Sequence, residues 1–271
     1  MGAIHGNEKC GTIAIDRVMQ EIDTGHLKIV KGEVTFIPIS NPKAYEIDQR
    51  YYERNLNRYF VPTENPDCYE AKLANILCPI LARCDVHLSI HSYTVGGAPF
   101  IFVSPTDKRE HDFATALGPH TLLTGWTEAY AATGRKAVAM DENEGVGTVE
   151  WARRCGAIGV DIECGQHKDP LAPGIAYDAI RNALRYLEII GEPKQEIKAP
   201  EKTQLVTMSR VYYRDDAGNF TKSWKHLEPV KKGEALALRA DGTPVVAPDD
   251  GYVIMPKDNA PIGEEWFYFG T

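Results

Sequence analysis

A histidine and a glutamate stand three residues apart near the start of the chain, at His5 and Glu8. They lie in a glycine-containing segment just before an expected helix, where residues i and i+3 can point the same way. One imidazole and one carboxylate in that arrangement supply two ligands of a zinc site. The spacing alone is unspecific, because a glutamate that begins a helix also stabilises the helix dipole.

A second group of polar side chains alternates along an apolar segment, at His87, Ser89 and His91. On a strand these three residues share one face. His91 falls at the strand's end, where open α/β sheets bind their ligands, so we predict that His91 is a metal ligand. His87 is predicted to be a core residue or a support for the ligand, and for each histidine a buried ring bonded to a backbone carbonyl is the alternative.

Three arginines, Arg50, Arg54 and Arg58, lie within one loop of an otherwise acidic protein. Guanidinium groups bind carboxylates through two parallel hydrogen bonds, which suggests an anion-binding site. The alternative is a set of surface arginines that pair with the acidic residues of the same loop.

Glu163 ends an apolar run, Val160 to Glu163, and is followed closely by Gly165. A carboxylate at the carboxyl end of a buried strand can serve as a general base with a raised pKa. Structural glutamates also occur at such positions, so this residue gains weight only in combination with the others.

The elements that must position these residues alternate between strands and helices. Apolar periodicity predicts helices over residues 7–23, 69–82, 108–117, 149–154 and 175–190, and strands over 33–40, 86–91, 99–103 and 157–163. Long loops are expected over 41–68 and 134–147. This alternation predicts an α/β fold with parallel strand pairs.

The pattern changes after a polar stretch with two prolines at 191–203, which we interpret as a linker. Short β-prone runs follow at 205–213, 235–239, 245–246 and 251–255, separated by glycine-containing turns. The sequence therefore predicts two domains, an α/β domain over 1–198, which carries the candidate residues above, and a small β domain over 199–271.

Composition excludes several classes of function. The 271 residues carry 30 basic and 38 acidic side chains, a formal net charge of -8, which argues against binding to nucleic acid or anionic membranes. The sequence lacks a long apolar window and the features of a signal peptide, so a cytoplasmic location is expected. Six cysteines without a Cys-x-x-Cys pair are expected to be reduced thiols.

Taken in order, the four segments resemble the succinylglutamate desuccinylase/aspartoacylase family, a branch of the zinc carboxypeptidase superfamily. The resemblance reaches to about residue 190, and the β module is similar to the family's C-terminal domain. Ser89 occupies a position where the family more often has Asp. The strand that leads into the His-x-x-Glu loop is expected to be absent because Met1 lies four residues before His5, and the substrate-contacting tyrosine of the aspartoacylase C-terminal domain has only Tyr252 and Tyr268 as nearby candidates.

The resemblance implies a carboxypeptidase-like fold, with a mixed, largely parallel sheet flanked by helices and a C-terminal all-β domain. It implies one Zn²⁺ per chain, held by His5, Glu8 and His91, with an open position for water. Glu163 would take a proton from the zinc-bound water, whose pKa the metal lowers toward neutrality.

The resemblance also implies residues that contact substrate. Arg50 would stabilise the negative charge that develops on the carbonyl oxygen, and Asn57 and Arg58 would clamp the substrate's α-carboxylate. Arg153 holds the offset of an arginine that contacts substrate in aspartoacylases, whereas Arg54 is expected to be structural. The expected reaction is hydrolysis of the amide bond of a small N-acyl amino acid or related carboxylate.

Two alternatives stay open at this point. The first is a metallocarboxypeptidase acting on peptides, and the second is a catalytically silent binding protein on the same scaffold. The sequence does not decide the acyl group, the amino acid or whether the chain forms a homo-oligomer.

Overall fold

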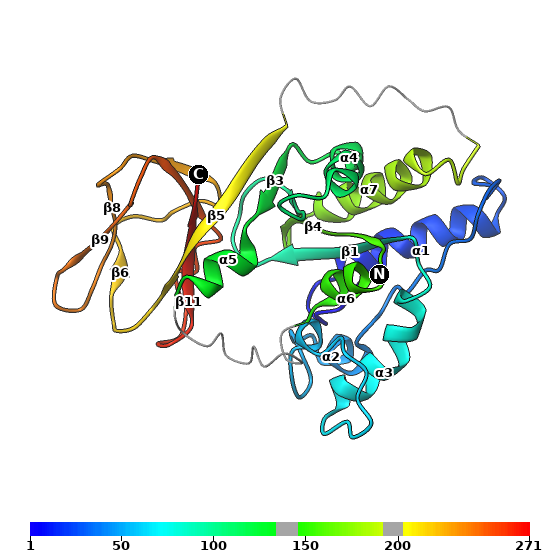
Figure 1. Ribbon diagram of the computed structural model, residues 1–271, viewed down its shortest axis with the longest axis horizontal. Coiled ribbons are helices and arrows are strands. Elements are labelled where there is room, and N and C mark those ends of the chain that lie inside the picture. Colours follow the sequence, from blue (N-terminus) through cyan, green and yellow to red (C-terminus); the bar gives the residue numbers. More distant parts are fainter. Residues whose placement is uncertain (134–145, 192–202) are drawn as a thin grey trace. The chain divides into compact units, whose positions relative to one another are not determined.

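The computed structural model describes residues 1–133, 146–191 and 203–271, which form two compact units (Figure 1). The first unit contains Met1–Ser92, Pro99–Leu122 and the described residues 146–191 and 203–204. The second contains Tyr93–Ala98, the described residues 123–133 and Leu205–Thr271. Most of the predicted loop 134–147, nearly all of the predicted linker 191–203 and the predicted domain boundary lie outside the described residues.

The sheet of the first unit is mixed. Its strands are β1 (Val86–Tyr93), β2 (Phe100–Phe102), β3 (Thr121–Thr124) and β4 (Ile158–Gln166), in the order β1-β4-β2-β3. Strand β2 runs antiparallel to β4, with Ile101 opposite Ile162. The helices of this unit are α1 (Cys10–Asp23), α2 (Pro42–Glu46), η1 (Leu56–Arg58), α3 (Tyr69–Leu81), α4 (Lys108–Leu117), α6 (Thr148–Arg154) and α7 (Ala172–Tyr186).

Helices flank both faces of this sheet, as Figure 1 shows for α7 and α4 on one side and α3 and α6 on the other. Their positions follow from local signals: the Asp107 carboxylate accepts a hydrogen bond from Arg109 N–H at the start of α4, and Gly118 ends that helix at a φ of 124°. Helix α3 contains Pro79 and ends at Leu81, close to the predicted end at residue 82. The predicted α/β fold class, with helices around a mixed sheet, is confirmed.

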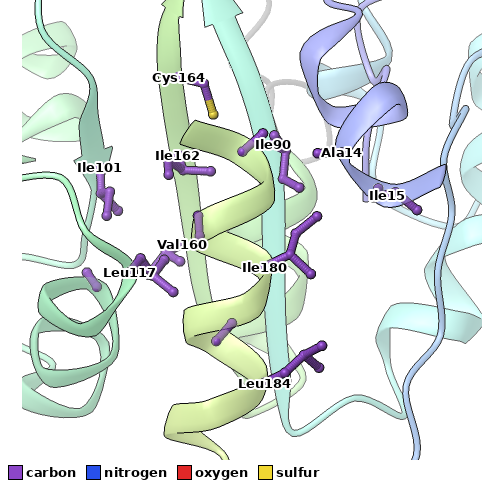
Figure 2. Close-up of a cluster of buried hydrophobic side chains, with 14 of the residues drawn as sticks. Ala14, Ile15, Ile90, Ile101, Leu117, Val160, Ile162, Cys164, Ile180 and Leu184 are labelled. Carbon is purple, nitrogen blue, oxygen red and sulfur yellow. The ribbon is translucent and has the colours of Figure 1, made fainter. Parts of the chain in front are cut away.

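Strict alternation along the strands separates the core from the polar face. Ile90 of β1 and Val160, Ile162 and Cys164 of β4 point into a hydrophobic core that α7 covers with Ile180 and other apolar residues (Figure 2). Because side chains of successive strand residues point to opposite faces, the intervening residues emerge on the other side of the sheet. These are His87, Ser89, His91, Asp161 and Glu163.

The predicted strand over 33–40 is wrong as a strand assignment. The backbone hydrogen bonds from this segment to residues 1–3 begin only at Ile37, whose carbonyl accepts from Gly2 N–H at 2.9 Å. Met1 on the other side donates its ammonium to Leu88 O at 2.7 Å and accepts from Ile90 N–H at 2.9 Å. Residues 1–3 therefore lie between β1 and the 37–41 segment. The strand predicted to be absent is the one that leads into the His-x-x-Glu loop, and residues 1–3 stand directly before that loop without forming a strand.

Residues 31–36 and the first residues of β1 are separated by a cavity and do not pair with each other. A cavity of about 760 Å³ is lined by residues 31–37 on one side and by Val86, His87 and Leu88 on the other. Because residues 33–36 face this cavity instead of a neighbouring strand, they form no ladder and are not a β-strand.

The second unit is built from α5 (Trp126–Ala131) and short antiparallel strands. The strands are β5 (Gln204–Tyr213), β6 (Asn219–Phe220), β7 (Glu228–Val230), β8 (Ala235–Leu238), β9 (Pro244–Val246), β10 (Gly251–Ile254) and β11 (Glu265–Gly270). They pair in the orders β5-β11-β10-β7 and β6-β8-β9. The predicted β character of this region is confirmed; α5, β3, β6, β7 and β11 were not predicted.

His226 is a buried histidine in this unit. Its Nδ1 atom accepts a hydrogen bond from Met255 N–H at 3.1 Å, and its ring lies 5.2 Å from that of Tyr93. Burial disfavours the charged imidazolium and lowers its pKa to about 3.

We expect His226 to make the protein less stable in acid. As the pH falls from about 6.5 toward 3, the unfolded chain takes up a proton that the folded chain does not, so the free energy of unfolding falls by about 1.4 kcal/mol per pH unit. Above that window the contribution is constant. His226→Asn keeps an acceptor for Met255 N–H without titrating, so urea unfolding at pH 7 and pH 5 should show a smaller decline than in the wild type. An equal decline in both proteins would contradict this assignment.

Candidate active site

His5, Glu8 and His91 meet in a buried cluster, and one possible ligand atom from each lies within 4.8 Å of the other two. The Glu8 carboxylate lies between the two imidazoles, with Oε1 2.8 Å from His5 Nδ1 and Oε2 2.9 Å from His91 Nδ1. Two imidazole nitrogens and a carboxylate that converge in this way form a donor set that zinc prefers.

The loop that carries His5 and Glu8 is held tightly before α1. Glu8 N–H donates to His5 O at 3.1 Å, which closes the turn, and Gly6 N–H donates to Arg50 O at 3.3 Å. A Cβ atom at Gly6 would overlap the backbone of Ala44, so this position requires glycine. The turn therefore places both side chains toward the end of β1.

The charged groups of the cluster shift one another's pKa values. Burial alone would raise the pKa of Glu8, but the neighbouring imidazoles of His5 and His91 outweigh it and hold that pKa well below its usual range. Burial, followed by the nearby Arg50 guanidinium, lowers the pKa of His5 to about 4. For His91 burial acts in the opposite direction, yet the Glu8 and Asp161 carboxylates raise its pKa well above the usual value. A cation at this position would replace the proton that these carboxylates stabilise on His91.

The outer nitrogen of each imidazole has its own partner. His5 Nε2 lies 3.0 Å from Asn55 Oδ1. Asn55 belongs to the segment 50–58 that contains the three arginines, which we call the arginine loop. His91 Nε2 lies 2.7 Å from Ser89 Oγ and 3.4 Å from Asp161 Oδ1. These contacts leave both Nδ1 atoms directed at Glu8.

His87 lies outside this cluster. Its ring is buried, its Nε2 atom makes no hydrogen bond to any residue that the structure describes, and burial lowers its pKa to about 3. The structure therefore brings His91, and not His87, to His5 and Glu8.

Glu163 has the surroundings expected of a general base. Its Oε2 atom is buried without a hydrogen-bond partner among the described residues. Burial raises its pKa well above the usual value, against the attraction of His91, while the negative charge of Glu8 raises it further. A carboxyl group whose pKa is raised in this way is suited both to accept and to release a proton.

The three arginines of the loop have different environments. Arg50 Nη1 lies 3.2 Å from Glu8 Oε1, at the edge of the cluster, with its side chain 47% exposed. Arg54 points outward to Tyr59 OH at 2.7 Å and to Asp67 at 3.1 Å. Arg58 is half-buried, and its Nη1 donates to the carbonyl of Asn57 at 2.6 Å.

Asn57 and Arg153, the other two predicted substrate contacts, form hydrogen bonds within the protein. The Asn57 side-chain oxygen accepts from Thr148 N–H at 3.0 Å, at the start of α6. Arg153 forms two hydrogen bonds of 2.8 Å each with the buried Glu110 carboxylate, which engages its Nε and Nη2 atoms. The substrate roles of Asn57, Arg58 and Arg153 stay predictions.

Glu70 is a supporting residue that sequence reasoning missed. Its buried carboxylate accepts hydrogen bonds from the backbone N–H groups of Tyr52 at 2.8 Å and Arg54 at 3.1 Å, and from that of Glu53 between them. The Asn41 side chain adds a fourth donor at 3.2 Å. In the sequence Glu70 is only a glutamate in the first turn of a helix, so no local signal reveals that it fixes the loop between Arg50 and Asn55.

Comparison with known proteins settles the family. Residues 1–190 match the family model for the succinylglutamate desuccinylase/aspartoacylase catalytic domain. The chain belongs to this family. An aspartoacylase from Danio rerio is 26% identical over 90% of this chain and 81% of its own length. A succinylglutamate desuccinylase from Vibrio campbellii is 24% identical over 96% of this chain and 76% of its own length.

The fold of this chain is similar to that of several solved structures. A succinylglutamate desuccinylase/aspartoacylase from Rhodobacter sphaeroides covers all of this chain and is itself covered to 83%, with a TM-score of 0.78 at 18% identity. The ectoine utilization protein EutE (DoeB) from Ruegeria pomeroyi, in a product-bound structure, has a TM-score of 0.75 at 21% identity, with the same coverage. None of the helices in the described parts of the chain is long and apolar enough to cross a membrane.

Removing the charge of Glu70 should loosen the arginine loop. In Glu70→Gln the amide NH₂ replaces one carboxylate oxygen and faces buried backbone N–H groups, so we expect the free energy of unfolding to fall by about 3 kcal/mol. The control is Glu53→Gln. The Glu53 carboxylate also joins the loop to the start of α3, because it accepts a hydrogen bond from Tyr69 N–H, but it is exposed. Chemical denaturation should show a loss below about 1 kcal/mol for that control. Equal losses would mean that Glu70 does not anchor the loop.

Proposed function

We propose that this protein is a zinc-dependent deacylase that hydrolyses the amide bond of small N-acyl amino acids. The observation that carries the proposal is the buried His5–Glu8–His91 cluster, with the Arg50 guanidinium beside it. The nearby Glu163 carboxyl adds a buried Oε2 atom that has no hydrogen-bond partner among the described residues. Membership of a family that contains aspartoacylases and succinylglutamate desuccinylases supports the same class of reaction.

The donor set fits zinc by its chemistry. His5 Nδ1, His91 Nδ1 and a Glu8 oxygen are the ligand atoms, and the partners of the two Nε2 atoms keep the rings turned toward one another. Zinc held by three protein ligands supplies a Lewis acid that lowers the pKa of water toward neutrality.

Glu163 moves the proton. Its buried Oε2 atom accepts a proton from the attacking water and later delivers it to the nitrogen of the departing amine. The pKa of this carboxyl, which burial raises well above its usual value, suits both transfers. General acid–base catalysis of this kind contributes about 10²- to 10⁴-fold in rate.

Positive charge in the arginine loop binds and orients an anionic substrate. Arg50 lies next to Glu8 and donates to the carbonyl oxygen as negative charge develops on it, an interaction worth about 3 kcal/mol. Arg58, together with Asn57 and Arg153, binds the carboxylate of the amino acid. The loop anchored by Glu70 positions Arg50, Asn57 and Arg58 relative to the cluster, whereas Arg153 is held on α6 by Glu110.

Glu163→Gln tests the reaction directly. A panel of N-acetyl, N-succinyl and N-formyl amino acids should include substrates that the wild type hydrolyses and that a chelator protects. The variant should keep its zinc, measured by atomic absorption, and lose at least about 100-fold in kcat because the amide cannot accept the proton. Retained turnover would contradict the role of Glu163, and chelator-resistant hydrolysis would contradict the role of zinc.

Arg58→Ala should raise KM for substrates with a free α-carboxylate, with a smaller effect on kcat, because it removes a binding contact. A tenfold rise in KM corresponds to about 1.4 kcal/mol of lost binding energy. Arg54→Ala is the matched control, since Arg54 lies in the same loop but points to Tyr59 and Asp67. An unchanged KM in Arg58→Ala, or the same rise in both variants, would argue against the carboxylate clamp.

A further inference from the structure

The geometry points to Asp161 as the residue that positions the metal ligand His91. We propose that its carboxylate holds the proton of His91 on Nε2 and so keeps Nδ1 directed at the metal. This inference rests on the proposed zinc site and assigns to Asp161 a role in metal affinity, not in the reaction itself.

Adjacent strands bring the two side chains together. Strands β1 and β4 are neighbours in the sheet, and His91 and Asp161 both emerge on the face opposite the hydrophobic core. Asp161 Oδ1 lies 3.4 Å from His91 Nε2 and has no hydrogen-bond partner in the described parts of the chain. Ser89, two residues before His91, places its Oγ 2.7 Å from the same nitrogen.

A histidine that binds metal through Nδ1 must carry its proton on Nε2. A carboxylate near that nitrogen fixes this tautomer, orients the ring and makes Nδ1 a stronger ligand. The two histidines of the cluster differ in this respect. His5 Nε2 faces the neutral amide of Asn55, whereas only His91 has a carboxylate close to its outer nitrogen.

Other charged groups surround Asp161 and define the control. Besides His91, the side chains of His87 and Arg153 attract its negative charge. If Asp161 acted through His87, removal of the His87 ring would reproduce the loss of the Asp161 carboxylate. If it acts through His91, a carboxylate on residue 89 can replace it, because Ser89 already reaches Nε2.

The experiment measures zinc affinity by competition with a chromophoric chelator. We expect Asp161→Asn to raise the Kd for zinc about 10- to 100-fold. The double variant Ser89→Asp/Asp161→Ser, which moves the carboxylate from β4 to β1, should recover most of the affinity. His87→Phe should bind zinc as the wild type does, and circular dichroism should show that each variant is folded.

Three results would overturn the inference: an unchanged Kd in Asp161→Asn, the same loss in His87→Phe, or no recovery in the folded double variant. If Asp161→Asn does not fold, the double variant decides alone, because it keeps the number of buried charges. A wild-type protein that binds no stoichiometric zinc would instead refute the proposed function, so the two failures are distinguishable.

Discussion

The site depends on one shared carboxylate. Glu8 is buried, and an isolated buried charge would cost several kcal/mol. It is tolerated because His5, His91 and Arg50 each place a nitrogen within 3.2 Å of its oxygens. Since these three residues come from an N-terminal turn, the end of a strand and a long loop, Glu8 ties together segments that are far apart in the chain.

The sheet makes this arrangement possible by dividing its residues between two faces. Even-numbered residues such as Ile90 and Ile162 pack under α7, and their odd-numbered neighbours emerge among polar groups. A shift of register by one residue would exchange the two sets, so the hydrophobic core that stabilises the fold also fixes the orientation of His91 and Glu163. Packing and chemistry are therefore specified by the same alternation.

The supporting residues show a common physical principle. Glu70 accepts hydrogen bonds from backbone N–H groups of the arginine loop and from the Asn41 side chain, and Asn55 lies against the outer nitrogen of His5. Each supplies an acceptor to a donor that burial has removed from water, where an unmet hydrogen bond costs about 1–3 kcal/mol. Such acceptors decide the direction in which the ligand nitrogens and the arginine loop point.

The sequence by itself determined the fold class, most helices and strands of the first unit, and the four segments from which the candidate site is built. These features are local: an apolar period of two or of 3.6 residues follows from burial on one face, and the spacing of His5 and Glu8 can be seen within one turn. The position of His91 at the end of its strand also predicted it, rather than His87, as the ligand. Tertiary structure alone decided that Glu70 anchors the loop after Arg50, that Arg153 pairs with Glu110, and that residues 33–36 form no strand. Each of these depends on a partner many residues away or on a neighbouring strand, and no local pattern encodes which buried group or strand edge will lie within reach.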